Sequence, residues 1–113
     1  MIRQVTLAVA MMALTGMNAW SEPRMIFRNG MASCGTWLQR RQSKQEAILA
    51  SWIVGYLSGL NMESSGPDAI VGTDYDSLMG WIDNYCRANP LHPIAQAATA
   101  LMGELRSRLK PGR

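Results

Sequence analysis

Apolar residues recur at intervals of three and four along three stretches of this chain, which is the spacing of one face of an α-helix. The first stretch runs from residue 43 to residue 62 and carries no charge from Ala47 onward. Its inner face is expected to hold Ile48, Trp52, Tyr56 and Leu60, with Leu49, Ile53 and Leu57 beside them. A helix this apolar suits the buried centre of a small domain.

Signals for the ends of helices accompany these stretches. Residues 43–46 read Ser-Lys-Gln-Glu, which matches a capping box, so the first helix is predicted to start at Ser43. Thr73 or Asp74 is expected to cap a second helix. That helix should end near Asn89, because the residue before a proline avoids the α region.

The remaining patterns complete a helical fold. The second helix is expected to turn inward Leu78, Trp81, Ile82, Tyr85 and Cys86. A third helix should start at Pro93 and bury a stripe of Ile94, Ala98, Leu101, Leu105 and Leu109. A short helical turn over residues 34–40, capped by Ser33, precedes all three. No strand-like alternation competes, so the predicted fold class is all-α: a small helical domain of three main helices plus a short N-terminal turn.

Residues 1–21 have the features of a secretory signal peptide. Arg3 supplies the positive charge, and an uncharged apolar run follows it. The small residues Ala19 and Ser21 favour cleavage after Ser21, with cleavage after Ala19 as the alternative. An uncleaved membrane anchor is a rival interpretation that the short apolar run disfavours. Export would place the protein in the periplasm, with secretion as the second choice, and cleavage would leave no stable membrane span.

Cleavage would leave about 92 of the 113 residues, divided into an irregular arm at residues 22–32 and a single helical domain at residues 33–113. An exported domain of this size with two cysteines, Cys34 and Cys86, favours a disulfide between them. Free thiols or an intermolecular pair are the alternatives. The disulfide would close a loop of about 50 residues and contribute about 4 kcal/mol in the chain-entropy model.

Charge is sparse and unevenly distributed. Hydrophobic residues make up 48% and charged residues 17%, which argues against a disordered chain. Five of the eight acidic residues fall in one stretch without Lys or Arg, which is a candidate pH-responsive acidic patch: Glu63, Asp68, Asp74, Asp76 and Asp83. Helix capping and solvation are the alternative explanation for this patch. Four basic residues close the chain, Arg106, Arg108, Lys110 and Arg113, and these are too few to predict a nucleic-acid partner.

The sequence offers no constellation for catalysis or metal binding. Its one histidine, His92, lies beside Pro93 with no candidate nucleophile in the adjoining residues. Residues 55–59 read Gly-Tyr-Leu-Ser-Gly, in which the serine comes one place too late for a nucleophile elbow. Gly55 and Gly59, with Trp52 and Tyr56, are instead predicted to form a helix-packing site. Two cysteines and one histidine are too few for structural zinc, so we expect no enzyme and no cofactor.

Three tryptophans follow the predicted signal peptide, namely Trp37, Trp52 and Trp81. They can fill a small core, or one of them can line an exposed patch for a partner. The sequence alone does not decide between these two arrangements.

Four features follow one another along the chain: a signal peptide, Ser33-Cys34, the stretch Trp-Ile-Val-Gly-Tyr-Leu-Ser-Gly at residues 52–59, and Cys86. In this order they resemble the HdeA/HdeB family of small periplasmic acid-stress chaperones. The resemblance implies an all-helical fold, a Cys34–Cys86 disulfide, and a dimer that loosens in acid and exposes apolar surface to unfolding client proteins. Protonation of the eight carboxylates would leave a strongly positive chain, whose self-repulsion favours such expansion.

Residues 84–91 and the alanine-rich final helix are also similar to the Tai-type immunity proteins of type VI secretion, which block a peptidoglycan amidase. Other proteins, either unfolding clients or a secreted hydrolase, are therefore the expected partners. The leading expectation is an exported, non-enzymatic protein-binding domain of the acid-stress chaperone type. The alternative is an immunity protein or inhibitor of a secreted cell-wall amidase.

Overall fold

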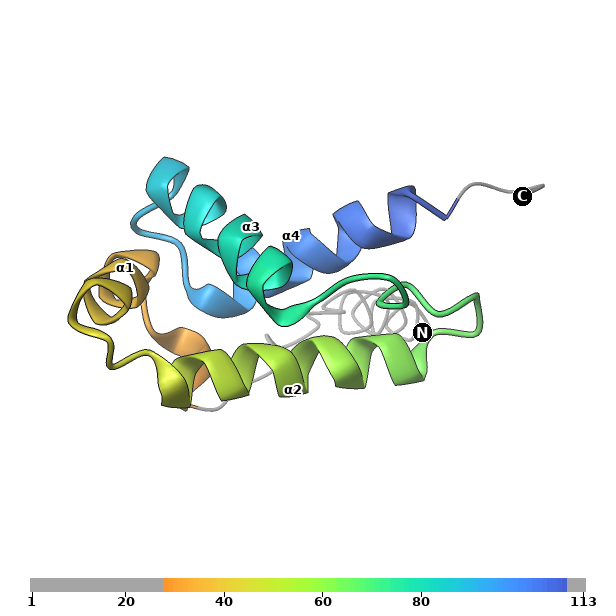
Figure 1. Cartoon of the computed structure of the whole chain (residues 1–113), viewed down its shortest axis with the longest axis horizontal. Helices are drawn as coiled ribbons and strands as arrows, with labels where there is room; N and C mark the ends of the chain where they lie inside the picture. The colour runs from red at the N-terminus through yellow and green to blue at the C-terminus, as the bar shows by residue number, and fades with distance from the viewer. Residues whose placement is uncertain (1–27, 110–113) are drawn as a thin grey trace, which may run out of the picture.

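The computed structural model describes residues 28–109. The predicted signal peptide at residues 1–21, most of the predicted irregular arm, and Lys110 and Arg113 of the basic end lie outside the described residues. Within residues 28–109 the chain forms a 3₁₀ turn and four α-helices without a strand: η2 Arg28–Met31, α1 Cys34–Ser43, α2 Ala47–Glu63, α3 Tyr75–Ala88 and α4 Ile94–Ser107 (Figure 1). The prediction of an all-α fold is confirmed, and the short N-terminal turn is a full helix.

Helix α4 lies at the centre of this arrangement. It contacts α1, α2, α3 and η2, whereas α1 packs chiefly on α3 (Figure 1). Seven of its fourteen residues are buried, including the small residues Ala95, Ala97 and Ala98, which let neighbouring helices approach on more than one side. Ile94, Ala98, Leu101 and Leu105 of the predicted stripe are buried as expected, whereas Leu109 lies beyond the end of α4 and is only partly buried. The expectation that the helix after residue 43 is the buried centre is wrong, because α2 buries only four of its seventeen residues.

The inner face of α2 also differs from the predicted one. Leu49, Ala50, Ile53 and Leu57 are buried, whereas Ile48 is 62% exposed. Four residues turn an α-helix by about 400°, so a row spaced by four drifts about 40° at each step. The predicted row therefore begins on the solvent side at Ile48 and turns toward the core, so that Trp52, Tyr56 and Leu60 are partly buried at its edge.

The predicted capping box is wrong. Ser43 is the last residue of α1, and its Oγ donates to the carbonyl oxygen of Gln39 at 3.1 Å. Lys44 then ends α1 in a left-handed conformation with φ 59°. Glu46 precedes α2 without a side-chain cap bond, and its carboxylate instead accepts from Arg41. Residues 43–46 therefore lie at the end of α1 and in the connection to α2, because α1 continues to Ser43 and not only to residue 40 as expected.

Other helix ends follow the sequence signals. Ser33 Oγ accepts from the backbone N–H of Thr36 at 3.1 Å, and Asp74 Oδ1 accepts from the backbone N–H of Ser77 at 2.7 Å. Helix α3 ends at Ala88, one residue before Asn89, and α4 begins directly after Pro93. These caps satisfy backbone groups that a helix terminus leaves without a partner.

The described end of the predicted irregular arm is ordered. Residues 28–31 form η2, which contacts α2 and α4 and buries Gly30. The next residues bond to the segment before α4: the backbone N–H of Ile94 donates to Ala32 O at 2.8 Å, and that of Cys34 donates to His92 O at 2.7 Å. This end of the predicted arm therefore forms a short 3₁₀ turn that packs against the helices.

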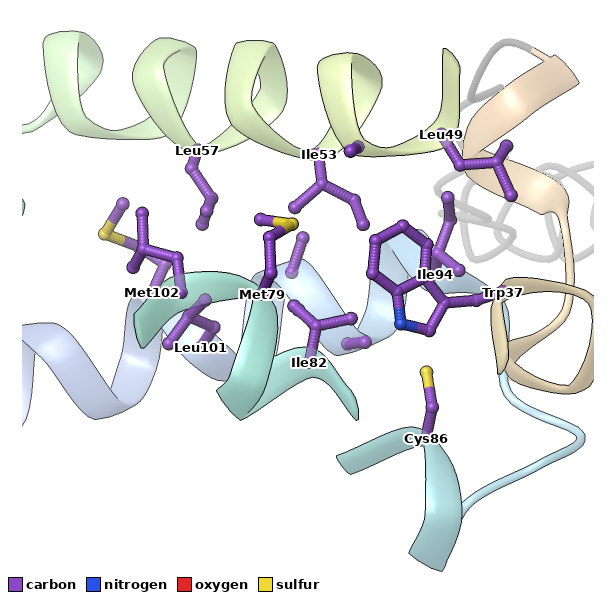
Figure 2. Packing of buried hydrophobic residues seen from close by; sticks show 14 of the residues in the cluster. Trp37, Leu49, Ile53, Leu57, Met79, Ile82, Cys86, Ile94, Leu101 and Met102 are labelled. Atoms are coloured by element: carbon purple, nitrogen blue, oxygen red, sulfur yellow. The ribbon is translucent and has the colours of Figure 1, made fainter. Parts of the chain in front are cut away.

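One apolar core joins all four helices (Figure 2). Leu49, Ile53 and Leu57 point from α2 toward side chains of α3 and α4 (Figure 2). The indole of Trp37 enters from α1 and has no exposed surface. The facing side chains of α3 and α4 include Met79, Ile82, Ile94, Leu101 and Met102. This cluster fixes the inner side of α2 and leaves its opposite side facing solvent.

Candidate functional site

The two cysteines join the first residue of α1 to the last turn of α3. Cys34 and Cys86 form a disulfide with Cα atoms 4.7 Å apart, and both are fully buried. This confirms the predicted pairing within one chain. The bond holds α1 against α3 at one point, about which the rest of α1 could still turn.

A buried carboxylate supplies a second point of attachment. Asp83 lies one helical turn before Cys86 and is only 9% exposed. Its Oδ1 accepts from Trp37 Nε1 at 2.8 Å, and its Oδ2 accepts from Arg41 Nη2 at 2.7 Å. Arg41 Nε also donates to Oδ1 at 3.1 Å, so the guanidinium grips both carboxylate oxygens. We call Trp37, Arg41, Glu46 and Asp83 the Asp83 cluster.

Arg41 connects three helices through this cluster. Its Nη1 donates to Glu46 Oε1 at 3.3 Å, just before α2, and its guanidinium lies 5.6 Å from the centre of the Trp37 ring. The hydrogen bonds from Arg41 to Asp83 raise the pKa of Arg41, against the opposing effect of burial. Since no buried side-chain N or O within residues 28–109 lacks a partner, the cluster has the character of a structural lock.

The predicted acidic patch does not form as one surface. Asp83 faces α1 from the buried side of α3, so its inclusion in an exposed patch is wrong. The sequence carried a signal for this, because Asp83 is four residues from Met79 and three from Cys86 and shares their helical face. Glu63 borders a shallow depression that also contains Arg106, so a basic side chain enters the same region.

Two of the remaining acidic residues organise backbone. Asp68 Oδ1 accepts from the backbone N–H of Ile70 and from Asn61 Nδ2, each at 2.9 Å, and these bonds lower the pKa of Asp68. The backbone N–H of Ser77 lowers the pKa of Asp74 in the same way. Asp76 lies exposed in the first turn of α3, where the helix dipole favours negative charge. Asp68 and Asp74 thus shape the loop between α2 and α3.

The side of α2 away from the core is uncharged and apolar at both ends. We call it the outer face of α2, comprising Ile48, Ser51, Trp52, Gly55, Ser58, Gly59 and Met62. Ile48 is 62% and Met62 is 84% exposed. At its first turn the outer face borders a shallow depression lined by Asn29, Ala47, Ile48, Ser51 and Trp52.

Gly55 and Gly59 lie on this outer face and not against another helix. A Cβ atom placed on either glycine would meet no neighbouring heavy atom within 4 Å. Within residues 28–109, no other helix packs closely on these glycines, contrary to the predicted helix-packing site. Trp52 and Tyr56, predicted to belong to the same packing site, stack on each other with ring centres 4.8 Å apart, and Tyr56 Oη lies 3.0 Å from Thr99 Oγ1 of α4.

The tryptophans divide between the two expected roles. Trp37 belongs to the core, whereas Trp52 and Trp81 are partly exposed at its edge. Trp81 stacks on Tyr85, with ring centres 5.7 Å apart. Trp52 thus lies on the uncharged outer face of α2.

The polar residues singled out for chemistry have structural partners. His92 Nδ1 lies 2.7 Å from Tyr85 Oη, a contact that sequence reasoning missed because the two residues are seven positions apart. Ser58 Oγ donates to the carbonyl oxygen of Val54 at 2.7 Å, within its own helix. In the part of the chain that the structure describes, no three His, Cys, Asp or Glu side chains gather where they could hold a metal ion.

No protein family, curated protein or solved structure matches this chain. Among residues 28–109, none of the helices has both the length and the apolar character needed to cross a membrane. The functional argument consequently rests on the residues themselves, and above all on the outer face of α2.

Proposed function

We propose that this protein is an exported, non-enzymatic domain that binds other proteins through the outer face of α2, as an acid-stress chaperone of the HdeA/HdeB type. The observation that carries the proposal is the outer face itself, which has no charged residue between Ala47 and Met62 and exposes Ile48 and Met62. Exposed apolar surface of this kind marks interaction sites on small soluble domains.

The chemistry of the outer face suits apolar segments of unfolding proteins. Its side chains present no charge that a partner would have to desolvate. Met62 offers a flexible thioether that adapts to irregular partners, and Trp52 offers a broad aromatic surface. The small residues between them keep the surface open along the helix. These properties favour binding of many sequences over recognition of one polar motif.

The carboxylates of the loop between α2 and α3 support a response to acid. Because hydrogen bonds lower the folded-state pKa of Asp68 and Asp74, each contributes stability that is fully present above its unfolded value of 3.8. That contribution is lost as the pH falls through the lower folded value. Acid should therefore loosen the loop and the start of α3, while the disulfide keeps α1 on α3.

Aggregation assays test the proposal. An acid-denatured client protein at pH 2–3 is followed by light scattering with and without this protein, and apolar-dye fluorescence is recorded from pH 7 to pH 2. The wild type should suppress scattering and bind dye in acid, whereas the double variant Ile48→Ser/Met62→Ser should lose most of this effect. Val71→Ser is the matched control, because Val71 is 73% exposed but belongs to the following loop. A wild type that stays dye-silent and leaves aggregation unchanged would overturn the proposal.

One feature favours the immunity protein or amidase inhibitor as a second candidate. The disulfide and the Asp83 cluster hold α1 and α3 rigidly, and preorganised surfaces suit a single tight partner. Such a protein should bind a secreted amidase with fixed stoichiometry at pH 7 and inhibit it. Titration calorimetry against an amidase encoded by a neighbouring gene separates the two candidates, since a chaperone should show no saturable binding at that pH.

A further inference from the structure

The methionines within residues 28–109 divide into an exposed pair and a buried pair. Met31 of η2 is 59% exposed, and Met62 in the last turn of α2 is 84% exposed. Met79 is 0% and Met102 is 1% exposed, and Figure 2 shows both among the packed side chains of the core. A reagent dissolved in water therefore reaches two thioethers of the folded domain directly, and the other two only after the core opens.

The exposed thioethers are also the sulfur atoms of the domain that are most open to oxidation. The two cysteines of the chain, Cys34 and Cys86, are joined in a fully buried disulfide, so no thiol competes for a mild oxidant. A thioether has no proton to lose before it reacts, so its reactivity depends chiefly on its exposure and is retained in acid. A peroxide should therefore attack Met31 and Met62 first.

Of these two methionines, only Met62 belongs to the outer face of α2. Beyond Trp52 that face consists of Gly55, Ser58, Gly59 and Met62, so Met62 supplies its one large apolar side chain at this end. Oxidation to the sulfoxide would place a polar oxygen there, which an apolar partner would have to desolvate. Because the side chain is already surrounded by water, the same change should leave the fold intact.

We propose that Met62 is a peroxide-sensitive site, and that its oxidation to the sulfoxide weakens apolar binding at this end of the outer face of α2. The Met62 sulfur attacks one oxygen of a hydroperoxide, and the O–O bond breaks as the S–O bond forms. The second oxygen takes up the proton and leaves as water or an alcohol, so the sulfur loses two electrons and the peroxide gains them. Methionine sulfoxide reductases, with thiols as the reductant, reverse the change. The loss of client binding rests on the proposed function, whereas the reactivity of Met62 does not.

The first part of the test measures where peroxide reacts. The exported chain, with its N-terminus mapped by mass spectrometry, carries Met25→Leu/Met31→Leu, since Met25 lies outside the described residues and Met31 is the other exposed methionine. Hydrogen peroxide is added at pH 7, and peptide mass spectrometry follows the gain of one oxygen atom. Trypsin leaves Met62 and Met79 in one peptide, so the digestion includes a protease that cleaves after Glu63. Met62 should be oxidised at least about tenfold faster than the two buried methionines.

The second part measures what oxidation does to binding. The same chain is compared with its Met62→Leu counterpart, in which an apolar side chain of similar size cannot be oxidised. Retention on a phenyl resin at pH 7 reports exposed apolar surface without any client, and suppression of client aggregation at pH 2–3 reports client binding. Peroxide should shorten the retention of the chain that keeps Met62 and reduce its suppression severalfold, and a sulfoxide reductase should restore both. The Met62→Leu counterpart should keep both, and urea unfolding should stay unchanged in either chain.

Three outcomes would overturn the inference. Oxidation of the buried methionines as fast as Met62 would mean that exposure does not select the site. Oxidation confined to Met62 with unchanged retention and suppression would mean that the sulfoxide does not weaken the outer face. Equal losses in the Met62→Leu counterpart would place the effect at other residues. If the unoxidised chain fails to protect clients while peroxide still shortens retention through Met62, the proposed function falls and the oxidation site stands.

Discussion

The contact between α1 and α3 and the contact between α2 and α4 are built in different ways. Helix α1 is held to α3 by the disulfide and by Asp83, which accepts hydrogen bonds from Trp37 and Arg41. Helix α2 is held to α4 by apolar side chains, with hydrogen bonds only at the rim, such as Arg106 Nη2 to Leu60 O at 3.0 Å. One contact is directional and covalent, and the other depends on burial.

The difference follows from the composition of the two helices. Helix α1 has ten residues, fully buries only Cys34 and Trp37, and would be marginal alone, so it depends on specific bonds. Helix α2 has seventeen residues that are apolar on nearly every side, and the core uses only one side. Its unused side is the outer face of α2. A domain that locks one helix pair by specific bonds can leave apolar surface on the other without losing its fold.

Removal of the disulfide should have the largest effect on this comparison. Replacing both cysteines, Cys34→Ser/Cys86→Ser, should lower the free energy of unfolding by about 4 kcal/mol, because the unfolded chain regains the freedom of a long closed loop. Urea denaturation at pH 7 measures the change. Wild type that has been unfolded, reduced and refolded under reducing conditions is the control and should match the double variant. A loss below about 1 kcal/mol would show that burial holds α1 as well.

Neutralising Asp83 should have the next largest effect. In Asp83→Asn the side chain keeps its size and an acceptor for Trp37, but Arg41 loses the closer of its two charged partners and keeps only Glu46. Since the Arg41 side chain is 32% exposed and partly solvated, we expect a loss of about 2 kcal/mol and not the full value of a deeply buried pair. Thermal and urea unfolding measure it against Asp76→Asn, an exposed carboxylate on the same helix. Equal losses of unfolding free energy in the two variants would contradict the role of the Asp83 cluster in holding α1 to α3.

The sequence predicts the helices better than it predicts their faces. The caps at Ser33 and Asp74, the stop before Pro90 and the stripe of α4 depend on local chemistry that a single chain displays directly. The central position of α4 could not be read in this way. It depends on several alanines admitting neighbours at once, which is a property of the assembled helices.

The candidate site was harder to predict for the same reason. The Asp83 cluster joins residues more than forty positions apart, and no local spacing reveals such a partner. Gly55 and Gly59 have the spacing of a helix contact, yet the core selects the opposite side of α2. The role in acid stays a prediction.

A smaller effect is expected between the two helix pairs, at the cap of α3. Asp74→Ala removes the acceptor for the Ser77 backbone N–H and should lower the melting temperature by a few degrees at pH 7. The folded-state pKa of Asp74 is lowered. The difference in melting temperature between the variant and the wild type should therefore be constant above about pH 5 and should vanish as the pH falls through the folded-state pKa of Asp74. Melting curves from pH 7 to pH 2 measure this, with Asp76→Ala as control. A difference that persists at pH 2 would mean that the carboxylate acts through packing instead of charge.

The smallest effect tests whether the outer face of α2 is free in the isolated domain. Alanine is the better helix former, and neither Gly55 nor Gly59 has a neighbour that a Cβ atom would strike. Each glycine-to-alanine change should therefore raise the free energy of unfolding by about 0.5–1 kcal/mol, and the double variant by about twice that. Gly72→Ala is the matched control and should destabilise the protein, since Gly72 has φ 83°. Destabilisation by Gly55→Ala that grows with protein concentration would instead show that a second copy packs closely on α2. The outer face of α2 would then be an interface, and the contrast between the α1–α3 contact and the α2–α4 contact would fail.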